Sequence, residues 1–127
     1  MLKSAPLYAY VPASNMERAR QFYEDKLALG RGQPSGPGLI FRFAGGTAFF
    51  LYPTANAGTN EASCAFWQVG DVKATVAWLK GRGVEFEEYD TPDMKTEGSI
   101  FTGGGAMAAW FKDTEGNIMA VVQELQG

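Results

Sequence analysis

The chain has 127 residues, of which 46% are hydrophobic and 20% are charged, and its net charge is −3. This length and composition predict one globular domain over residues 1–127, and the acidic balance disfavours nucleic acid or an anionic membrane as a partner. The sequence contains no histidine. That absence excludes histidine-based triads and dyads and most zinc or non-haem iron sites.

Cys64 is the one cysteine, so the chain cannot form an internal disulfide bond. A lone cysteine is consistent with a reducing compartment. The N-terminal residues lack the apolar stretch of a signal peptide, and no apolar run approaches the ~18 residues that a membrane helix needs. We therefore expect a cytoplasmic protein with neither a membrane nor a nucleic-acid partner.

The first half of the chain predicts one helix among short strands. Ser14 or Asn15 can cap the helix, whose apolar residues recur with helical spacing, and Gly30 ends it. The apolar helix face consists of Ala19, Phe22, Tyr23 and Leu27. The predicted elements are a strand at 7–11, the helix at 16–29, a loop with at most a short irregular strand at 31–38, and strands at 39–44 and 47–52 around a Gly45–Gly46 turn.

The second half, after a linker at 53–61, predicts a similar order of elements. Asp71 is a strong helix cap, and Val72, Val76 and Leu79 form the inward face of the helix. The predicted elements are a strand at 63–69, a helix at 72–82, a half-exposed strand at 84–89, a long loop at 90–105, and strands at 107–112 and 118–122. The loop is a candidate lid with a glycine hinge at 103–105.

The two halves form a diverged internal repeat. An offset of 56 residues carries Asn15 onto Asp71 and Phe22 onto Trp78. Each half is predicted to run strand–helix–strand–strand–strand, which gives two modules at about 5–53 and 62–124.

The last two strands enclose a polar turn at 113–117. Asp113 can bond its own backbone at the start of this turn, and Gly116 can adopt a positive φ. These features predict a hairpin near the C-terminus.

Three segments together resemble the vicinal oxygen chelate superfamily, which includes glyoxalase I, extradiol dioxygenases and bleomycin-resistance proteins. Residues 11–24 resemble its opening strand, cap and helix, residues 69–72 the start of its second module, and residues 110–117 its closing hairpin. The family usually has Asp where Asn15 stands and Pro where Thr114 stands. The resemblance implies an α+β fold in which two βαβββ modules form a cup-shaped mixed-sheet barrel with the helices outside.

The resemblance also implies four metal-ligand positions, usually His, Glu or Gln, inside the cup. Carried over residue by residue, they fall on Tyr8, Phe50, Cys64 and Ala120. Phenylalanine and alanine have no donor atom, and a lone Cys with a neutral Tyr is a poor site for a divalent cation. We therefore expect neither a metal nor another cofactor.

Strand alternation extends the cup lining to neighbours two residues away from these positions. The expected ligand-binding residues are Tyr8, Tyr10, Phe50, Tyr52, Cys64, Phe66, Gln68 and Ala120, with Ile118 and Val122 beside them. Such an aromatic lining is typical of a small-molecule pocket, although a small barrel can also fill itself with these side chains. Arg42 either binds a ligand carboxylate or lies on an exposed face.

Three functions are compatible with these features. The favoured one is a metal-free protein that holds an aromatic or hydrophobic small molecule, with a cationic ligand suiting its acidic charge. The alternative is a glyoxalase- or dioxygenase-like enzyme, a lyase or oxidoreductase with an atypical site. The third is a metal-free enzyme or a protein-interaction module, with a tyrosine or Cys64 as reactive group. The resemblance further implies a homodimer.

Overall fold

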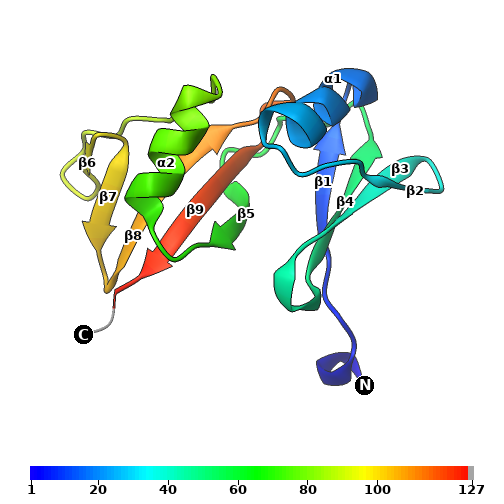
Figure 1. Ribbon diagram of the computed structural model, residues 1–127, viewed down its shortest axis with the longest axis horizontal. Helices are drawn as coiled ribbons and strands as arrows, with labels where there is room; N and C mark the ends of the chain where they lie inside the picture. The colour runs from blue at the N-terminus through cyan, green and yellow to red at the C-terminus, as the bar shows by residue number, and fades with distance from the viewer. Residues whose placement is uncertain (126–127) are drawn as a thin grey trace. The chain divides into compact units, whose positions relative to one another are not determined.

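The computed structural model, described for residues 1–125, contains two compact units that are each built around one mixed β-sheet (Figure 1). The first unit comprises Met1–Glu61 together with Thr114–Asn117, and the second comprises Ala62–Asp113 and the chain from Ile118 onward. The predicted α+β class is confirmed, with one four-stranded and one five-stranded sheet. Each sheet is open at its edges, and the cup-shaped barrel remains a prediction.

The first unit has the strand order β1-β4-β3-β2, with β1 parallel to β4 and the other pairs antiparallel. Its elements are η1 (Leu2–Ser4), β1 (Ala9–Ala13), α1 (Met16–Gln21), η2 (Phe22–Lys26), β2 (Gln33–Ser35), β3 (Gly38–Arg42), η3 (Ala44–Gly46) and β4 (Ala48–Pro53). Strand β1 begins two residues later than predicted. Leu7 therefore lies outside the strand, and it is 90% exposed.

The first helix begins at the predicted cap and changes its winding halfway along. Asn15 is the cap, since its Oδ1 accepts a hydrogen bond of 3.0 Å from the Arg18 N–H. After Gln21 the helix continues as the π-helical segment η2, with the Leu27 N–H donating to the Phe22 carbonyl at 2.9 Å. The predicted single α-helix to residue 29 is thus wrong in its second half. Its predicted apolar face is nevertheless buried.

The core of the first unit is aromatic. The fully buried Tyr23 packs its ring 5.1 Å from Phe49 and 6.1 Å from Phe41, on the side of the sheet that carries α1 and η2. The Tyr23–Phe49 pair is edge-to-face, and such pairs add to the free energy gained from area burial. The sheet is therefore covered by helix on one face only.

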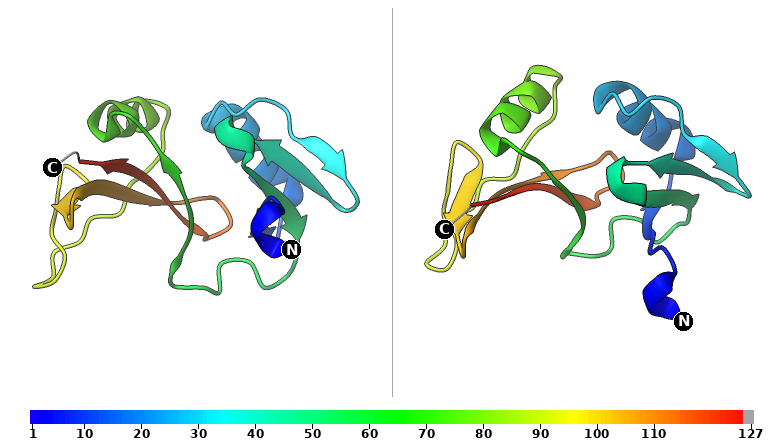
Figure 2. Two further views of the ribbon diagram at one scale, coloured as in Figure 1. Left: turned by 90° about the horizontal axis from the view of Figure 1, so that it is seen from below. Right: turned by 60° about the horizontal axis from the view of Figure 1, so that its bottom comes forward.

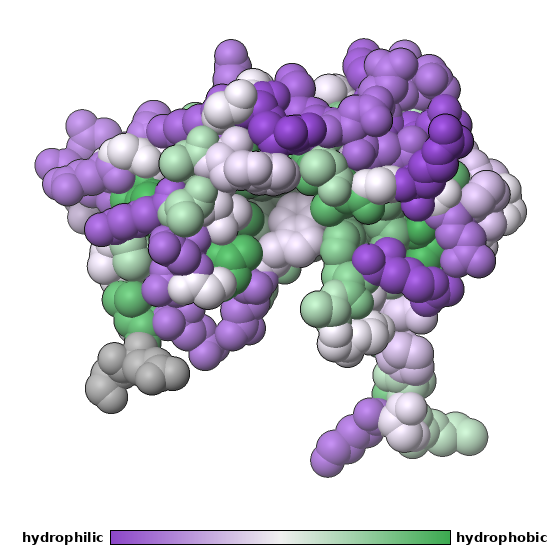
Figure 3. Space-filling model, in the orientation of Figure 1, coloured by the Kyte–Doolittle hydropathy of each residue, from purple (hydrophilic) through white to green (hydrophobic). Residues whose placement is uncertain are grey.

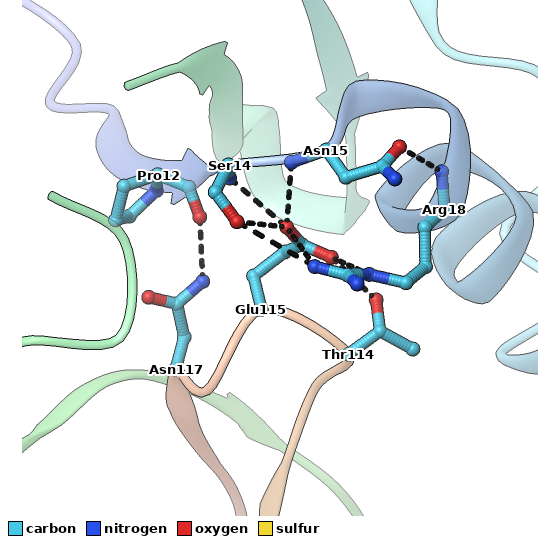
Figure 4. Close-up of polar contacts among 7 residues, drawn as sticks. All are labelled: Pro12, Ser14, Asn15, Arg18, Thr114, Glu115 and Asn117. Atoms are coloured by element: carbon cyan, nitrogen blue, oxygen red, sulfur yellow. Dashed lines mark hydrogen bonds and ion pairs between the residues drawn. The ribbon is translucent and has the colours of Figure 1, made fainter. Parts of the chain in front are cut away.

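The turn between β8 (Ala106–Lys112) and β9 (Ile118–Glu124) belongs to the first unit through its contacts (Figure 4). Oε1 of the fully buried Glu115 side chain accepts hydrogen bonds of 2.9 Å from the backbone N–H groups of Ser14 and Asn15. Arg18 donates from Nε to Oε2 at 2.8 Å and from Nη2 to Oε1 at 3.1 Å. Asn117 donates from Nδ2 to the Pro12 carbonyl at 2.8 Å.

These bonds set the ionisation of Glu115. Burial alone raises the pKa of a carboxyl group, but the hydrogen bonds from Arg18, from the Asn15 N–H and from Thr114, with the charge of Arg18, lower the pKa of Glu115 from 4.5 to about 2. The sequence indicates a turn at this position but not a buried carboxylate at the start of α1.

We predict that Glu115→Gln lowers the free energy of unfolding at neutral pH by about 2 kcal/mol, because charge-assisted hydrogen bonds are lost. The unfolded chain takes up a proton near pH 4.5 and the folded chain only near pH 2, so this stabilisation is complete above pH 4.5 and falls toward pH 2. Urea unfolding at a series of pH values measures both effects. The variant should lose less stability over that interval than the wild type. Glu17→Gln, at an exposed carboxylate in α1, is the control.

The second unit has the strand order β5-β9-β8-β7-β6, with β5 parallel to β9 and the other pairs antiparallel. Its further elements are β5 (Ser63–Gln68), α2 (Val72–Gly81), β6 (Thr96–Glu97) and β7 (Ile100–Gly103). Asp71 caps α2 as predicted, accepting from the Ala74 N–H at 3.0 Å. Figure 2 shows α2 on one face of this sheet, where it packs against β8 and β9. None of the helices in residues 1–125 is long and apolar enough to cross a membrane.

Two predictions for the second unit are wrong. Residues 84–89 form no strand, and within them only Phe86 bridges to β8, at Phe111. The predicted lid loop at 90–105 instead contains the hairpin β6–β7. Its glycines are not a hinge, because Gly104 and Gly105, with φ of 61° and 79°, form the tight turn between β7 and β8.

The repeat does not extend to every equivalent side chain. Phe22 is buried, whereas its counterpart Trp78 is 51% exposed, with the Arg82 guanidinium carbon 5.1 Å from its ring centroid. The π-helical winding begins at Phe22 and has no equivalent in α2. The two helices therefore present different residues to their sheets.

We predict that Phe111→Ala lowers the free energy of unfolding by about 3–5 kcal/mol, because it opens a cavity in the core of the second unit. The Phe111 side chain is fully buried between Trp67, at 6.3 Å between ring centroids, and Phe86, at 5.4 Å. Chemical denaturation followed by circular dichroism measures the change. The control is Lys112→Ala, at the exposed neighbouring residue, which should change the free energy of unfolding little. An equal loss of stability in both variants would contradict the burial of Phe111.

Candidate functional site

The second sheet has one face covered by α2 and an opposite face, here called the helix-free face. Side chains paired directly across neighbouring strands point to the same face of a sheet. Phe66 pairs with Ala120 and Ala120 with Trp110, and Gln68 pairs with Val122. Gln123 of β9 accepts a hydrogen bond from the Val72 N–H of α2, so its neighbour Val122 points away from the helix. Three predicted site residues, Phe66, Gln68 and Ala120, therefore share the helix-free face with Trp110 and Val122.

A cavity of about 280 Å³ lies at one end of the helix-free face. Its lining consists of Phe66, Gln68, Gly104, Gly105, Ala106, Val122, Glu124 and Leu125. Phe66 is 62% exposed, and Glu124 is the one charged residue among those of residues 1–125 that line the cavity. The site thus offers an aromatic surface, an amide and a carboxylate.

An aromatic cluster on the same unit was not among the predicted site residues. The Trp110 ring lies 5.6 Å from that of Tyr89 and 6.3 Å from that of Phe101. Burial, and then the charge of Glu87, raise the pKa of Tyr89, so its hydroxyl stays neutral and able to donate a hydrogen bond. The pairing of Trp110 with the predicted site residue Ala120, across the closing hairpin, is a signal that could have revealed this aromatic cluster from the sequence.

Cys64 does not share the helix-free face, contrary to the prediction. The pairing of β5 with β9 shifts by one residue between Ser63 and Ala65, so Cys64 occupies a bulge. Its Sγ lies 3.3 Å from Sδ of the fully buried Met119, which is on the opposite face from Ala120. Burial, and then the charge of Asp113, raise the pKa of the Cys64 thiol.

The predicted residues of the first unit lie on the face of its sheet away from the buried core. Tyr10 pairs with Phe50, and the Tyr10 ring lies 5.8 Å from Phe50 and 5.1 Å from Tyr52. Tyr10 is 67% exposed. Tyr8 precedes β1 in the chain, and its hydroxyl accepts a hydrogen bond of 3.4 Å from Nη1 of Arg42. These four aromatic residues and Arg42 therefore form one aromatic surface.

The hydropathy of the surface differs between the parts over the helices and the parts over the strands. In Figure 3 hydrophilic residues dominate the surface over the helices at the top of the view, and hydrophobic residues gather lower, over the strands.

The four positions that correspond to the family's metal ligands do not fit a metal ion. Phe50 and Ala120 have no donor atom, and Ala120 is only 3% exposed. The Cys64 thiol points toward Met119. Within residues 1–125, no three His, Cys, Asp or Glu side chains gather closely enough to hold a metal. No reaction step through a metal follows from these residues.

No protein-family model matches the sequence, and no curated protein sequence matches it significantly. Solved structures do match the fold. A glyoxalase/bleomycin resistance protein from Catenulispora acidiphila DSM 44928 is 18% identical, with 94% of this chain and 98% of that chain covered and a TM-score of 0.68.

Two further structures are similar over nearly their whole length. TnmS3, an antibiotic binding protein from Streptomyces sp. CB03234, is 24% identical over 98% of each chain with a TM-score of 0.66. The oxidase ChaP-H1 is 19% identical over 94% of this chain and 95% of that chain, with a TM-score of 0.69. The chain therefore has the fold of glyoxalase/bleomycin resistance proteins, as its motifs predict.

We predict that iodoacetamide alkylates Cys64 more slowly than free cysteine at neutral pH, because the raised pKa leaves little thiolate and the thiol is partly buried. Mass spectrometry of the alkylated protein gives the rate. Asp113→Asn should accelerate the reaction, since the neighbouring charge is removed while the burial remains. Alkylation faster than that of free cysteine would identify Cys64 as an activated nucleophile.

Proposed function

We propose that this protein binds an aromatic or hydrophobic small molecule without a metal ion and without chemical transformation. The observation that carries the proposal is the cavity on the helix-free face of the second sheet, with the exposed Phe66 beside Gln68 and Val122. Exposed aromatic rings and a few polar groups are typical of ligand sites. The shared fold with an antibiotic binding protein supports the same class of function.

The charge of the cavity favours a ligand with a cationic group. Among the described residues that line it, Glu124 is the one with an ionisable side chain, and the whole chain carries a net charge of −3. A planar cation can stack on Phe66 while its charge faces the Glu124 carboxylate. The acidic chain adds a favourable long-range field for such a ligand.

A glyoxalase- or dioxygenase-like enzyme is the second candidate, favoured by the shared fold with an oxidase. Its chemistry would have to use residues outside the four positions considered for a metal, because two of these have no donor atom. A catalytic role for Cys64 is disfavoured by its raised pKa and its contact with Met119.

We also propose a homodimer that resides in the cytoplasm. The support for a dimer is the exposed aromatic surface of the first unit, in which Tyr10 is 67% exposed. The support for the cytoplasm is the single Cys64, which stays a free thiol. Sedimentation equilibrium tests the dimer directly.

We predict that proflavine, a planar aromatic cation, stabilises the protein against thermal unfolding. Phe66→Ala should weaken its binding about tenfold by removing the stacking surface. Glu124→Gln should weaken proflavine but leave the neutral 2-naphthol unchanged, because only the ionic contact is lost. Isothermal titration calorimetry gives the affinities.

Matched controls are Trp78→Ala, at an exposed aromatic residue on α2, and Glu85→Gln, at an exposed carboxylate. Neither residue lines the cavity on the helix-free face. If no aromatic or cationic compound shifts the unfolding temperature at millimolar concentration, the proposed binding function is wrong. If the control variants weaken proflavine as much as Phe66→Ala does, the ligand binds elsewhere.

A further inference from the structure

A second cavity, of about 460 Å³, lies on the opposite face of the second sheet, beside α2. Its lining consists of Lys73, Lys95, Glu97, Ile100, Thr102 and Met107. None of these residues lines the cavity on the helix-free face, so the two are separate sites.

The cavity exists because one helix cannot cover five strands. α2 packs against β8 and β9, while β6 and β7 extend beyond it at the sheet edge. Ile100 pairs with Glu97 and Thr102 with Met107, so these four side chains share the face beside α2. Ile100 and Met107 are half-buried and give the cavity an apolar floor.

The cavity is lined by charges of both signs that do not neutralise one another. Within residues 1–125, Lys73 forms no ion pair, and neither lysine Nζ lies within 4.0 Å of a Glu97 carboxylate oxygen. Lys95 reaches the exposed Asp90 at 3.7 Å, and such exposed pairs are weak. Lys73 lies in the first turn of α2, where the helix dipole reinforces its positive charge. The Asp71 carboxylate opposes this effect, but it already caps the helix.

We propose that this cavity binds a small zwitterion with an apolar side group, the chemistry of an apolar amino acid. The ligand carboxylate faces the ammonium groups of Lys73 and Lys95, and its ammonium group faces the Glu97 carboxylate. The side group rests on Ile100 and Met107. The proposal does not depend on the ligand of the helix-free face, because the two cavities share no residue.

The test is a titration of the isotope-labelled protein followed by two-dimensional ¹H–¹⁵N NMR. The probes are L-leucine, 4-methylpentanoate, which lacks the ammonium group, and 3-methylbutylamine, which lacks the carboxylate. We expect leucine to bind most tightly and to shift the amide signals of residues 95–102 and of the first turn of α2. If no probe shifts these signals at millimolar concentration, or if the three bind equally well, the proposal is wrong.

Charge-removing variants assign the contacts. Lys73→Gln and Lys95→Gln should each weaken leucine about tenfold, and Glu97→Gln should reduce leucine to the affinity of 4-methylpentanoate. Lys80→Gln, also on α2, and Phe66→Ala, on the helix-free face, should leave leucine binding unchanged. Equal weakening by Lys73→Gln and Lys80→Gln would show general charge attraction instead of a site, and would overturn the proposal.

Discussion

The structure depends on one constraint: in each unit, as far as residues 1–125 describe it, one continuous stretch of helix packs on one face of one sheet. When a helix covers one face of a sheet, the other face is either exposed to water or in contact with a ligand or partner. Here the uncovered faces carry aromatic residues, such as Tyr10 in the first unit and Phe66 in the second, and both are more than half exposed. The same shortage of helix leaves β6 and β7 uncovered beside α2. Both cavities of the second unit follow from this coverage.

A second determinant is the buried carboxylate of Glu115. It accepts hydrogen bonds from the backbone at the start of α1 and pairs with Arg18 through both oxygens. The hairpin turn that contains it therefore has two roles, since Gly116, with a φ of 85°, shapes the turn while Glu115 accepts the hydrogen bonds from the start of α1. Breaking a charge pair of this kind leaves a buried charge without its partner, which is costly.

The fold and the side chains of the site give different information about function. The fold is shared with binding proteins and with an oxidase, so it does not choose between them. Of the four positions where the family resemblance places metal ligands, Phe50 and Ala120 have no donor atom. The thiol of Cys64 is turned to Met119, and burial raises its pKa. What the second unit offers is an apolar, aromatic cavity with the carboxylate of Glu124.

The sequence by itself determined the helix caps at Asn15 and Asp71 and the closing hairpin, because these depend on local hydrogen bonding and turn geometry. Strand alternation, counted from the positions that the family resemblance implies, also placed Phe66 and Gln68 on one face with Ala120. It failed at Cys64, because a single bulged residue reverses the direction of a side chain. Only the tertiary structure decided that Glu115 is buried against Arg18 and that Trp110 meets Tyr89. These outcomes depend on contacts between residues far apart in the chain, which no local pattern records.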